Sequence, residues 1–423
     1  MYVYKNVKFV FMIFFTACRC LIMKLLRIEA SGFELFENNL TINFLAKQRV
    51  TDDSSLYHLF QKGDLNPINA LIGINASGKT STLKLICTVL EILNFTPLNY
   101  LKYKELFREG HNHKLCIYFY TEDGMLHKLE SEIVFSDESG VESPLYFSEE
   151  YLYSKKVTSV KSKSQVFEFT NSSLVTERKN VGLLLTDDTS ILYKLKKEVD
   201  NDLLSLNYIN SIHFTNINVL NFKLPDSSDN GSKFVFPVNL IHFLDPSVES
   251  LELRKINKLE TYLLKFKNGQ EFSVNSPMDL GNYLSSGSIK GLYIYLSAMQ
   301  ILKSGGILIL DEIENHFNQE LVKTLLSLFE RKRTNPNGAV IVFTTHYAEL
   351  LDLFDRNDCI NLVRHNYQNN TGISIRNLSD LLERNDLKRS DVYKSDYIGG
   401  TSPSYSSYKL FEKDLLAFVS NDR

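Results

Sequence analysis

Cysteine is scarce in this sequence, and its few positions do not form a metal-binding spacing. The five cysteines are odd in number and lie at Cys18, Cys20, Cys87, Cys116 and Cys359. A disulfide framework needs pairs of cysteines, and a zinc motif needs paired ligands at short, repeated spacings. The pattern therefore argues against a disulfide-rich secreted domain, suits a reducing compartment and predicts a cytoplasmic protein.

A strong net charge, internal repeats and sustained heptads are also missing. The formal net charge at pH 7 is −3, so nucleic-acid binding would need a local basic patch. Without heptads the chain has no long coiled-coil arm, and without a repeat of about 20 to 50 residues it is no solenoid. Its 423 residues, 43% of them hydrophobic and 23% charged, are ordinary for a soluble globular protein of two or three domains, or of one domain with large insertions.

No hydrophobic run at the N-terminus is long enough to span a membrane. Lys5 and Lys8 precede an apolar stretch from Phe9 to Cys18, which is similar to the start of a signal peptide. A spanning helix takes about 20 apolar residues, so this stretch is too short. We expect residues 1–22 to be an appendage outside the fold, with a membrane-associated segment as the alternative.

Local patterns predict strands on either side of the chain's most informative motif. The segment from Met23 to Phe44 alternates as antiparallel strands do, and "KLCIYFYTEDGMLHKLESEIVF" predicts two strands joined at Glu122-Asp123-Gly124. The region 137–275 is less regular. We interpret it as an insertion.

The stretch "GINASGKT" fits the phosphate-binding P-loop pattern G-x-x-x-x-G-K-[ST]. Glycines at positions 73 and 78 let backbone N–H groups turn toward a β-phosphate, and Lys79 reaches the β and γ oxygens. An apolar strand before the loop and a helix from Lys79 to Leu93 are predicted, and the helix N-terminus would face the phosphate. The pattern predicts ATP binding by Gly73, Asn75, Ala76, Ser77, Gly78, Lys79, Thr80 and Ser81.

A second acidic strand is expected beside a P-loop, and "GGILILDEIENHF" supplies one. The buried-strand run Ile307 to Leu310 ends at Asp311 and Glu312. Asp311 can hold Mg²⁺ through water beside the hydroxyl of Thr80, and Glu312 can polarise the attacking water. The sequence therefore predicts an ATPase with ATP and Mg²⁺ as cofactors, with Thr80 and Asp311 at the metal and Glu312 as a catalytic residue.

Two later stretches, a serine-glycine helix start and a strand that ends in histidine, follow the P-loop in the chain and flank the acidic strand. Leu284-Ser285-Ser286-Gly287 precedes an apolar helix, and "GAVIVFTTHYAELLD" contains a buried strand that ends at His346. The order of P-loop, serine-glycine helix start, acidic strand and strand-end histidine resembles the ABC-type ATPase head. In that resemblance these are the Walker A, signature, Walker B and switch-histidine motifs, and residues 315–318 match the D-loop.

Three further segments make the resemblance narrower. "LDEIENHFNQELV", "MKLLRIEASGFELFENNLTINF" and "HFLDPSVESLEL" resemble OLD-like, AAA-type ATPases of prokaryotic anti-phage and abortive-infection systems. The likeness covers residues 23–352 and departs from transporter heads at Ser286, where those carry glycine. A Q-loop glutamine is not evident, although Gln165 is a candidate.

The resemblance implies an α/β P-loop NTPase fold: an ABC-ATPase-like head with N-terminal antiparallel strands and a mixed α/β insertion between Walker A and the signature. Two copies would meet head to tail, so that Ser285 and Gly287 of one contact the γ-phosphate held by Lys79 of the other. His346 would act with Glu312 on the attacking water. The expected units are an appendage (1–22), an N-terminal lobe (23–136), an insertion (137–275), a C-terminal lobe (276–375) and a tail that is a candidate docking segment (376–423).

Three functions fit these motifs. The first is a homodimeric ATPase that senses or regulates a separately encoded effector, such as a nuclease, in anti-phage defence. The second is a RecF-like DNA clamp, in which Lys155, Lys156, Lys161 and Lys163 could bind DNA. The third, a transporter subunit, is weakened by Ser286, the missing Q-loop glutamine and the large insertion. We favour the first and expect no integral membrane partner.

Three residues near these motifs are open to more than one interpretation. Glu314 could bind a neighbouring subunit or cap the helix that starts near Asn318, and we assign it no catalytic role. Phe33 and Phe36 could stack on adenine, but core packing is the better interpretation.

Overall fold

The computed structural model describes residues 21–48, 55–136, 144–180, 185–198, 204–212, 233–256, 259–276, 278–315, 317–366, 372–382, 387–395 and 405–420. Residues 1–20 of the predicted appendage lie outside the described residues, whereas residues 21 and 22 begin the first strand. Within the described part, no helix is both long and apolar enough to cross a membrane.

The first sheet is built mainly from antiparallel strands of the N-terminal half. Its order is β10-β1-β6-β7-β8-β9, with β2 paired to β1, and only the β1–β10 pair is parallel. The strand pair β1–β2 and the β6–β7 hairpin confirm the two predicted antiparallel segments. The bounds are β1 Leu21–Ser31, β2 Leu40–Asn43, β6 His113–Thr121, β7 Met125–Phe135, β8 Leu145–Lys156, β9 Ser173–Glu177 and β10 Leu204–Ser205.

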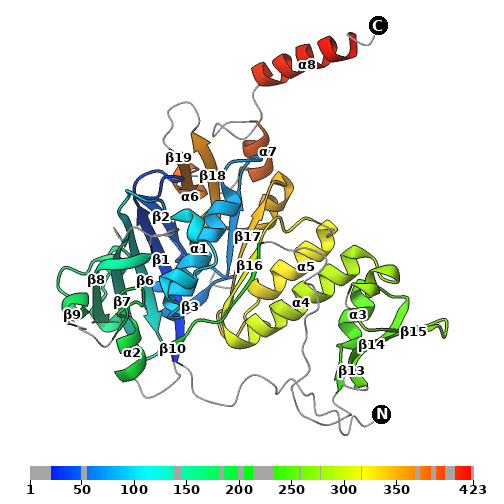
Figure 1. Ribbon diagram of the computed structural model, residues 1–423, viewed down its shortest axis with the longest axis horizontal. Coiled ribbons are helices and arrows are strands. Elements are labelled where there is room, and N and C mark those ends of the chain that lie inside the picture. Colours follow the sequence, from blue (N-terminus) through cyan, green and yellow to red (C-terminus); the bar gives the residue numbers. More distant parts are fainter. Residues whose placement is uncertain are drawn as a thin grey trace.

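The second sheet, with the order β11-β16-β17-β5-β18-β19, occupies the centre of the molecule (Figure 1). All its neighbouring strands run parallel except the antiparallel pair β18–β19. Its strands are β5 Ile68–Ile72, β11 Tyr208–Ser211, β16 Ile307–Leu310, β17 Val340–Thr345, β18 Ile360–Asn366 and β19 Gly372–Asn377. The chain is therefore a mixed α/β protein, which is consistent with the P-loop NTPase fold expected from the sequence.

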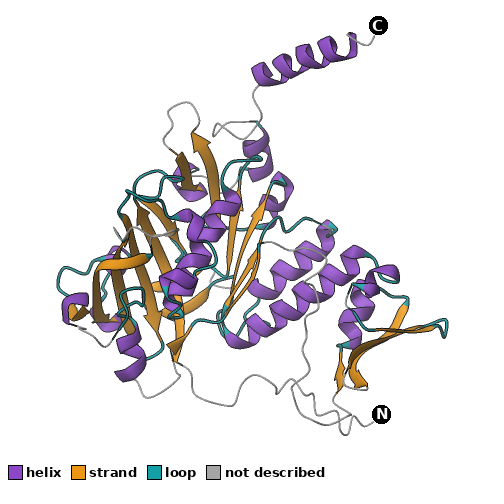
Figure 2. Ribbon diagram, viewed as in Figure 1, coloured by secondary structure: helices purple, strands orange, loops and turns teal. Residues whose placement is uncertain are grey.

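Helices cover both faces of the central sheet (Figure 2). Side chains alternate along a strand, so Ile307 and Ile309 of β16 join the core shared with α1 (Lys79–Leu93) and the first sheet. Leu308 and Leu310 face the opposite core, which contains α4 (Ser286–Ser304) and α5 (Gln319–Glu330). This layering holds α1 between the two sheets.

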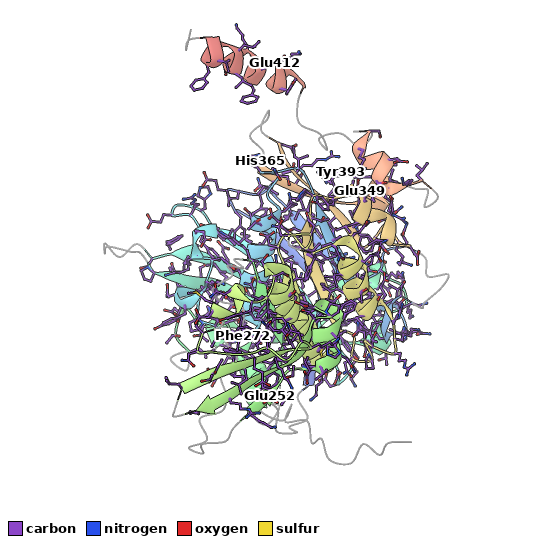
Figure 3. All side chains as sticks on the ribbon, turned by 90° about the vertical axis from the view of Figure 1, so that its right-hand side faces the viewer. Glu252, Phe272, Glu349, His365, Tyr393 and Glu412 are labelled. Atoms are coloured by element: carbon purple, nitrogen blue, oxygen red, sulfur yellow. The ribbon has the colours of Figure 1, made fainter. Side chains whose placement is uncertain are left out.

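A smaller third sheet packs against the N-terminal half of α4. It consists of β12 Lys233–Val235, β13 Val248–Ile256, β14 Leu259–Phe266 and β15 Glu271–Val274, all antiparallel, with α3 Val238–Leu244 beside it. Ile289, Leu292 and Leu296 of α4 belong to its core. Figure 3 shows Glu252 and Phe272 of this sheet at the end of the molecule away from the C-terminal helices.

The remaining elements are short or peripheral. They are the hairpin β3 Tyr57–Phe60 with β4 Gly63–Leu65, the helices α2 Tyr193–Glu198, α6 Leu378–Leu381, α7 Arg389–Lys394 and α8 Tyr405–Ser420, and the 3-10 helices Leu98–Tyr100, Lys104–Leu106, Val157–Ser159, Ser164–Phe167, Arg178–Asn180, Asp279–Asn282 and Ala348–Leu353. In Figure 3, Glu349 lies beside Tyr393 of α7, and Glu412 lies on α8, which projects away from the body.

The described strands of the predicted insertion, residues 137–275, do not share one sheet. β8 and β9 extend the first sheet, β11 is an edge of the central sheet, and β12–β15 form the third. The sequence could not show this, because strand pairing depends on contacts between distant segments rather than on local pattern. The five proposed unit boundaries stay a prediction.

We expect one buried histidine in the first sheet, His127, to make stability depend on pH. His127 is 5% exposed, its Nε2 lies 2.9 Å from Thr121 Oγ1 and its Nδ1 lies 2.6 Å from Ser154 Oγ. Burial lowers its pKa to about 4, against a weaker opposing effect of Asp123. The unfolded chain, with an ordinary histidine pKa of about 6.5, binds more protons in this range, so stability is full above pH ~6.5 and falls toward pH ~4.

We expect His127 to account for about 3 kcal/mol of this loss, because each pKa unit corresponds to about 1.4 kcal/mol. Unfolding free energies of the native chain and of His127→Gln, measured in urea between pH 7 and pH 4, check this. The substituted chain should lose less stability over that range. An identical pH dependence in both chains would contradict the assignment.

Candidate functional site

Three chain segments that carry the predicted motifs meet at one edge of the central sheet. The strands β5, β17 and β16 are parallel neighbours in that order. Their carboxyl ends therefore lie at the same edge, where ligands bind in open α/β sheets. The residues that follow them are 73–80, 346 and 311–312, respectively.

The loop at residues 73–78 connects buried β5 to the start of α1 and needs both of its glycines. A Cβ on Gly73 would lie 2.4 Å from the carbonyl oxygen of Val363. Gly78 has a φ of +99°, and a Cβ there would lie 2.4 Å from Ile373 Cδ1. A left-handed backbone next to packed side chains admits only glycine at low cost. The two glycines thus let the backbone itself form the inner surface of the loop, and backbone N–H groups are what bind phosphate in a phosphate-binding loop.

The side chains of this loop differ in their exposure to solvent. Asn75 and Ala76 are exposed, whereas Ser77 is 2% exposed, and its hydroxyl has no hydrogen-bond partner within the described residues. An orphaned buried hydroxyl beside a helix N-terminus fits an anionic oxygen of a ligand. Ser81 is half-buried in the first turn of α1.

Lys79 bends back over the loop. Its Nζ donates to the carbonyl oxygens of Gly73 at 2.8 Å and of Ile74 at 2.9 Å, and the residue is 7% exposed. Burial lowers the pKa of Lys79, an effect that the carboxylates of Glu312, Asp311 and Glu314 oppose. A phosphate in the loop would give this ammonium group a stronger partner than two carbonyls.

A hydroxyl from the first turn of α1 and a carboxylate that follows β16 form the predicted metal-binding position. Thr80 Oγ1 donates to Asp311 Oδ2 at 2.8 Å, and Thr344 Oγ1 donates to Asp311 Oδ1 at 2.5 Å. Among the described residues, no cluster of three or more His, Cys, Asp or Glu side chains could hold a metal by itself. One carboxylate with a hydroxyl suits Mg²⁺, which keeps water ligands and shares the phosphates of its nucleotide.

Glu312 has a constrained backbone next to this position. Its φ is +49°, a left-handed conformation that few non-glycine residues adopt and that is frequent at functional sites. Its N–H donates to Thr344 Oγ1 at 2.7 Å, and Asn315 Nδ2 donates to its Oε2. The carboxylate is half-buried, so water can reach it while the backbone stays fixed.

His346 stands at the end of β17, between the P-loop strand and the acidic strand. Its side chain is 39% exposed, and its Nδ1 lies 2.6 Å from Glu314 Oε1. The structure thus brings Lys79, Thr80, Asp311, Glu312 and His346 to one edge.

Ser285 and Gly287 lie at the start of α4, Ser285 as the residue that caps it. Ser285 caps the helix: its Oγ accepts a hydrogen bond from the N–H of Ser288 at 2.9 Å. Ser285 is exposed and Gly287 is half-buried. Within the described part of the chain, no hydrogen bond joins either residue to the loop at 73–80. The helix start is therefore open to contact from outside the chain.

Sequence reasoning did not predict the roles of three residues at this edge. Thr344 bridges Asp311 and the backbone of Glu312, Asn315 holds the Glu312 carboxylate, and Glu314 holds His346. The available signal was their position, because polar residues at the ends of neighbouring parallel strands come together at one edge.

Several other candidates lie away from this edge or are already engaged. The Gln165 side chain accepts from Lys161 N–H at 2.8 Å, in the 3-10 helix Ser164–Phe167 between β8 and β9. Lys155 Nζ donates to the carbonyls of Gln165 and Glu168, and Lys163 Nζ to those of Ala46 and Gln48. Two of the four lysines thus fix loops, which weakens the DNA-clamp interpretation.

The two aromatic candidates for stacking on adenine belong to the hydrophobic core. Phe33 is 2% exposed and Phe36 is 5% exposed. The Phe33 ring packs 5.4 Å from that of Phe107. These contacts favour the core-packing interpretation.

Comparison with protein families adds an independent finding. A family model described as "AAA domain, putative AbiEii toxin, Type IV TA system" matches residues 68–352, two thirds of the chain. The matched segment begins at β5 and ends shortly after His346, so it contains the whole edge described above. A search of curated proteins found no match.

Proposed function

This chain belongs to the family of AAA domains described for AbiEii-type toxins, and on that premise we propose that it binds and hydrolyses ATP with Mg²⁺. Two copies pair head to tail around the nucleotide in an ABC-type, OLD-like arrangement. The pair acts in the cytoplasm as a sensor or regulator of a separately encoded effector, such as a nuclease, in anti-phage defence.

The observation that carries this proposal is the set of polar groups at the carboxyl edge of the central sheet. Lys79 and the loop N–H groups bind the β- and γ-phosphates, and Ser77 adds a hydroxyl. Thr80 and Asp311, already 2.8 Å apart, are placed to hold Mg²⁺, which neutralises charge that develops on the phosphates. Glu312 orients water for attack, and His346 steadies the γ-phosphate.

The exposed start of α4 supports the head-to-tail pair. A 19-residue helix presents its positive end to solvent at Ser285, and within the described residues no hydrogen bond joins Ser285 to the loop at 73–80. An anionic γ-phosphate held by a second copy would satisfy these N–H groups. ATP would then favour association, and hydrolysis would weaken it.

The C-terminal helix is the candidate site for the effector. α8 carries exposed apolar side chains that find no cover within the described chain: Leu410, Phe411, Leu415, Leu416, Phe418 and Val419. Exposed apolar residues gathered on one helix mark an interaction surface. A chain without α8 should therefore hydrolyse ATP but no longer retain the effector.

The proposal is tested with the purified chain, ATP and Mg²⁺. Phosphate should be released only when both are present, and light scattering with a non-hydrolysable ATP analogue should show the mass rise from one chain of 48.7 kDa to two. A mass that does not change at saturating nucleotide, with no phosphate released, would contradict the proposal.

A further inference from the structure

Glu314 is buried, and its carboxylate contacts one residue, His346. Its side chain is 3% exposed, and a single oxygen, Oε1, accepts from His346 twice: from the backbone N–H at 2.8 Å and from Nδ1 at 2.6 Å. The other oxygen, Oε2, has no partner within the described residues. Burying a carboxylate is costly unless it is well paired, so the position calls for an explanation.

The two roles considered from sequence do not account for this geometry. Asn318, not Glu314, caps α5, because Asn318 Oδ1 accepts from the N–H of Leu321 at 2.9 Å. Glu314, with its backbone included, is 6% exposed, so it also offers little surface to a neighbouring subunit. What Glu314 does contact is the histidine at the end of the next strand.

That contact determines how the imidazole ring can be used. With Nδ1 donating to a carboxylate, a neutral ring carries its proton on Nδ1 and leaves the lone pair on Nε2. Nε2 has no partner within the described chain, and the His346 side chain is 39% exposed. The ring of Tyr347 packs edge-on at 4.7 Å and limits its rotation further.

We propose that Glu314 is a positioning residue that fixes the orientation and the tautomer of His346, so that Nε2 faces the reacting γ-phosphate and water. The inference rests on the proposed ATPase function. Glu314 Oε1 accepts both hydrogen bonds from His346, so positioning the ring requires an acceptor oxygen at that point. Without Glu314, the His346 ring would be rotated, or would carry its proton on Nε2, for part of the time.

The charged groups around Glu314 are consistent with this role. Lys290 Nζ donates to the carbonyl of Asn315 at 2.8 Å, and the carboxylates of Glu312, Glu314 and Asp311 counteract the burial that lowers the pKa of Lys290. The same three carboxylates also raise the pKa of Lys79 against the effect of burial. These ammonium groups offset part of the cost of burying the Glu314 charge.

A double-mutant cycle tests the inference through turnover. Glu314→Ala should lower kcat by about 10- to 100-fold with little change in KM, the range found when the partner that orients a metal-bound histidine is removed. In a His346→Ala background the same change should cost almost nothing. Glu314→Gln keeps an acceptor oxygen and should restore kcat to within a few-fold of the native value.

Equal losses in both backgrounds, or a Glu314→Gln variant as slow as Glu314→Ala, would overturn the inference. Circular dichroism and ATP-binding measurements on each variant separate a folding defect from a positioning defect. A native chain that releases no phosphate would count against the proposed function instead.

A second measurement does not depend on turnover. Long-range ¹H–¹⁵N spectra of the histidine rings, assigned with His346→Gln, should show the Nδ1–H tautomer for His346 in the native chain. Glu314→Ala should shift the ring toward Nε2–H, and Glu314→Gln should not. A native His346 in the Nε2–H form, or one unchanged in Glu314→Ala, would overturn the inference whether or not the chain is an ATPase.

Discussion

Glu312→Gln is expected to slow ATP hydrolysis by about 10²- to 10⁴-fold while leaving ATP binding intact, which is the range for loss of a general base. The substitution keeps the size of the side chain and an acceptor oxygen for Asn315, but removes the charge that polarises water. Single-turnover phosphate release measures the chemical step directly. ATP-bound pairs should accumulate, because the step that ends their association is blocked.

The matched control for this prediction is Glu320→Gln. Glu320 is an exposed carboxylate in the first turn of α5, with a surface ion pair to Lys323 at 2.8 Å. Its loss should leave the rate unchanged within about two-fold, because exposed pairs contribute little. If the two variants hydrolyse ATP at equal rates, Glu312 has no part in the reaction.

Lys79→Ala is expected to weaken ATP binding by about 10²-fold or more. The ammonium group lies over the loop within 3 Å of two carbonyls, where β- and γ-phosphate oxygens would replace them. A hydrogen bond to a charged group contributes about 1.5–3 kcal/mol, so losing contacts to two phosphates accounts for this factor. Titration with a fluorescent ATP analogue gives the dissociation constant.

Lys84→Ala serves as the control for the lysine. Lys84 lies further along the same helix, and its Nζ pairs with Glu105 at 2.9 Å, away from the loop. Its removal tests whether loss of any positive charge from α1 reduces affinity. Native affinity in Lys79→Ala, or equal losses in both variants, would refute a specific phosphate contact.

Where the signal is local, the sequence predicts the structure well. The helix from Lys79 to Leu93 and the strand from Ile307 to Leu310 have the predicted bounds. A glycine that must adopt a positive φ, followed by apolar residues at helical spacing, determines where α1 begins. The predicted start of α5 near Asn318 is confirmed for the same reason, because a capping side chain is a local signal.

Features that depend on distant pairing could not be predicted. β11 joins β16 through backbone hydrogen bonds, which carry no residue code, so its place at the edge of the central sheet was not evident. The bridging role of Thr344 and the Glu314–His346 pair arise only because β16 and β17 end at the same level.

The most direct measurement mixes two inactive variants and records phosphate release. Lys79→Ala has a defective loop and an intact α4 start, whereas Ser285→Arg has the reverse, so each should be inactive alone. In an equal mixture, half of the pairs contain one of each, and each such pair has one intact site. The account predicts recovery of about a quarter of the native rate. A mixture no more active than its two components would contradict a site shared between two copies.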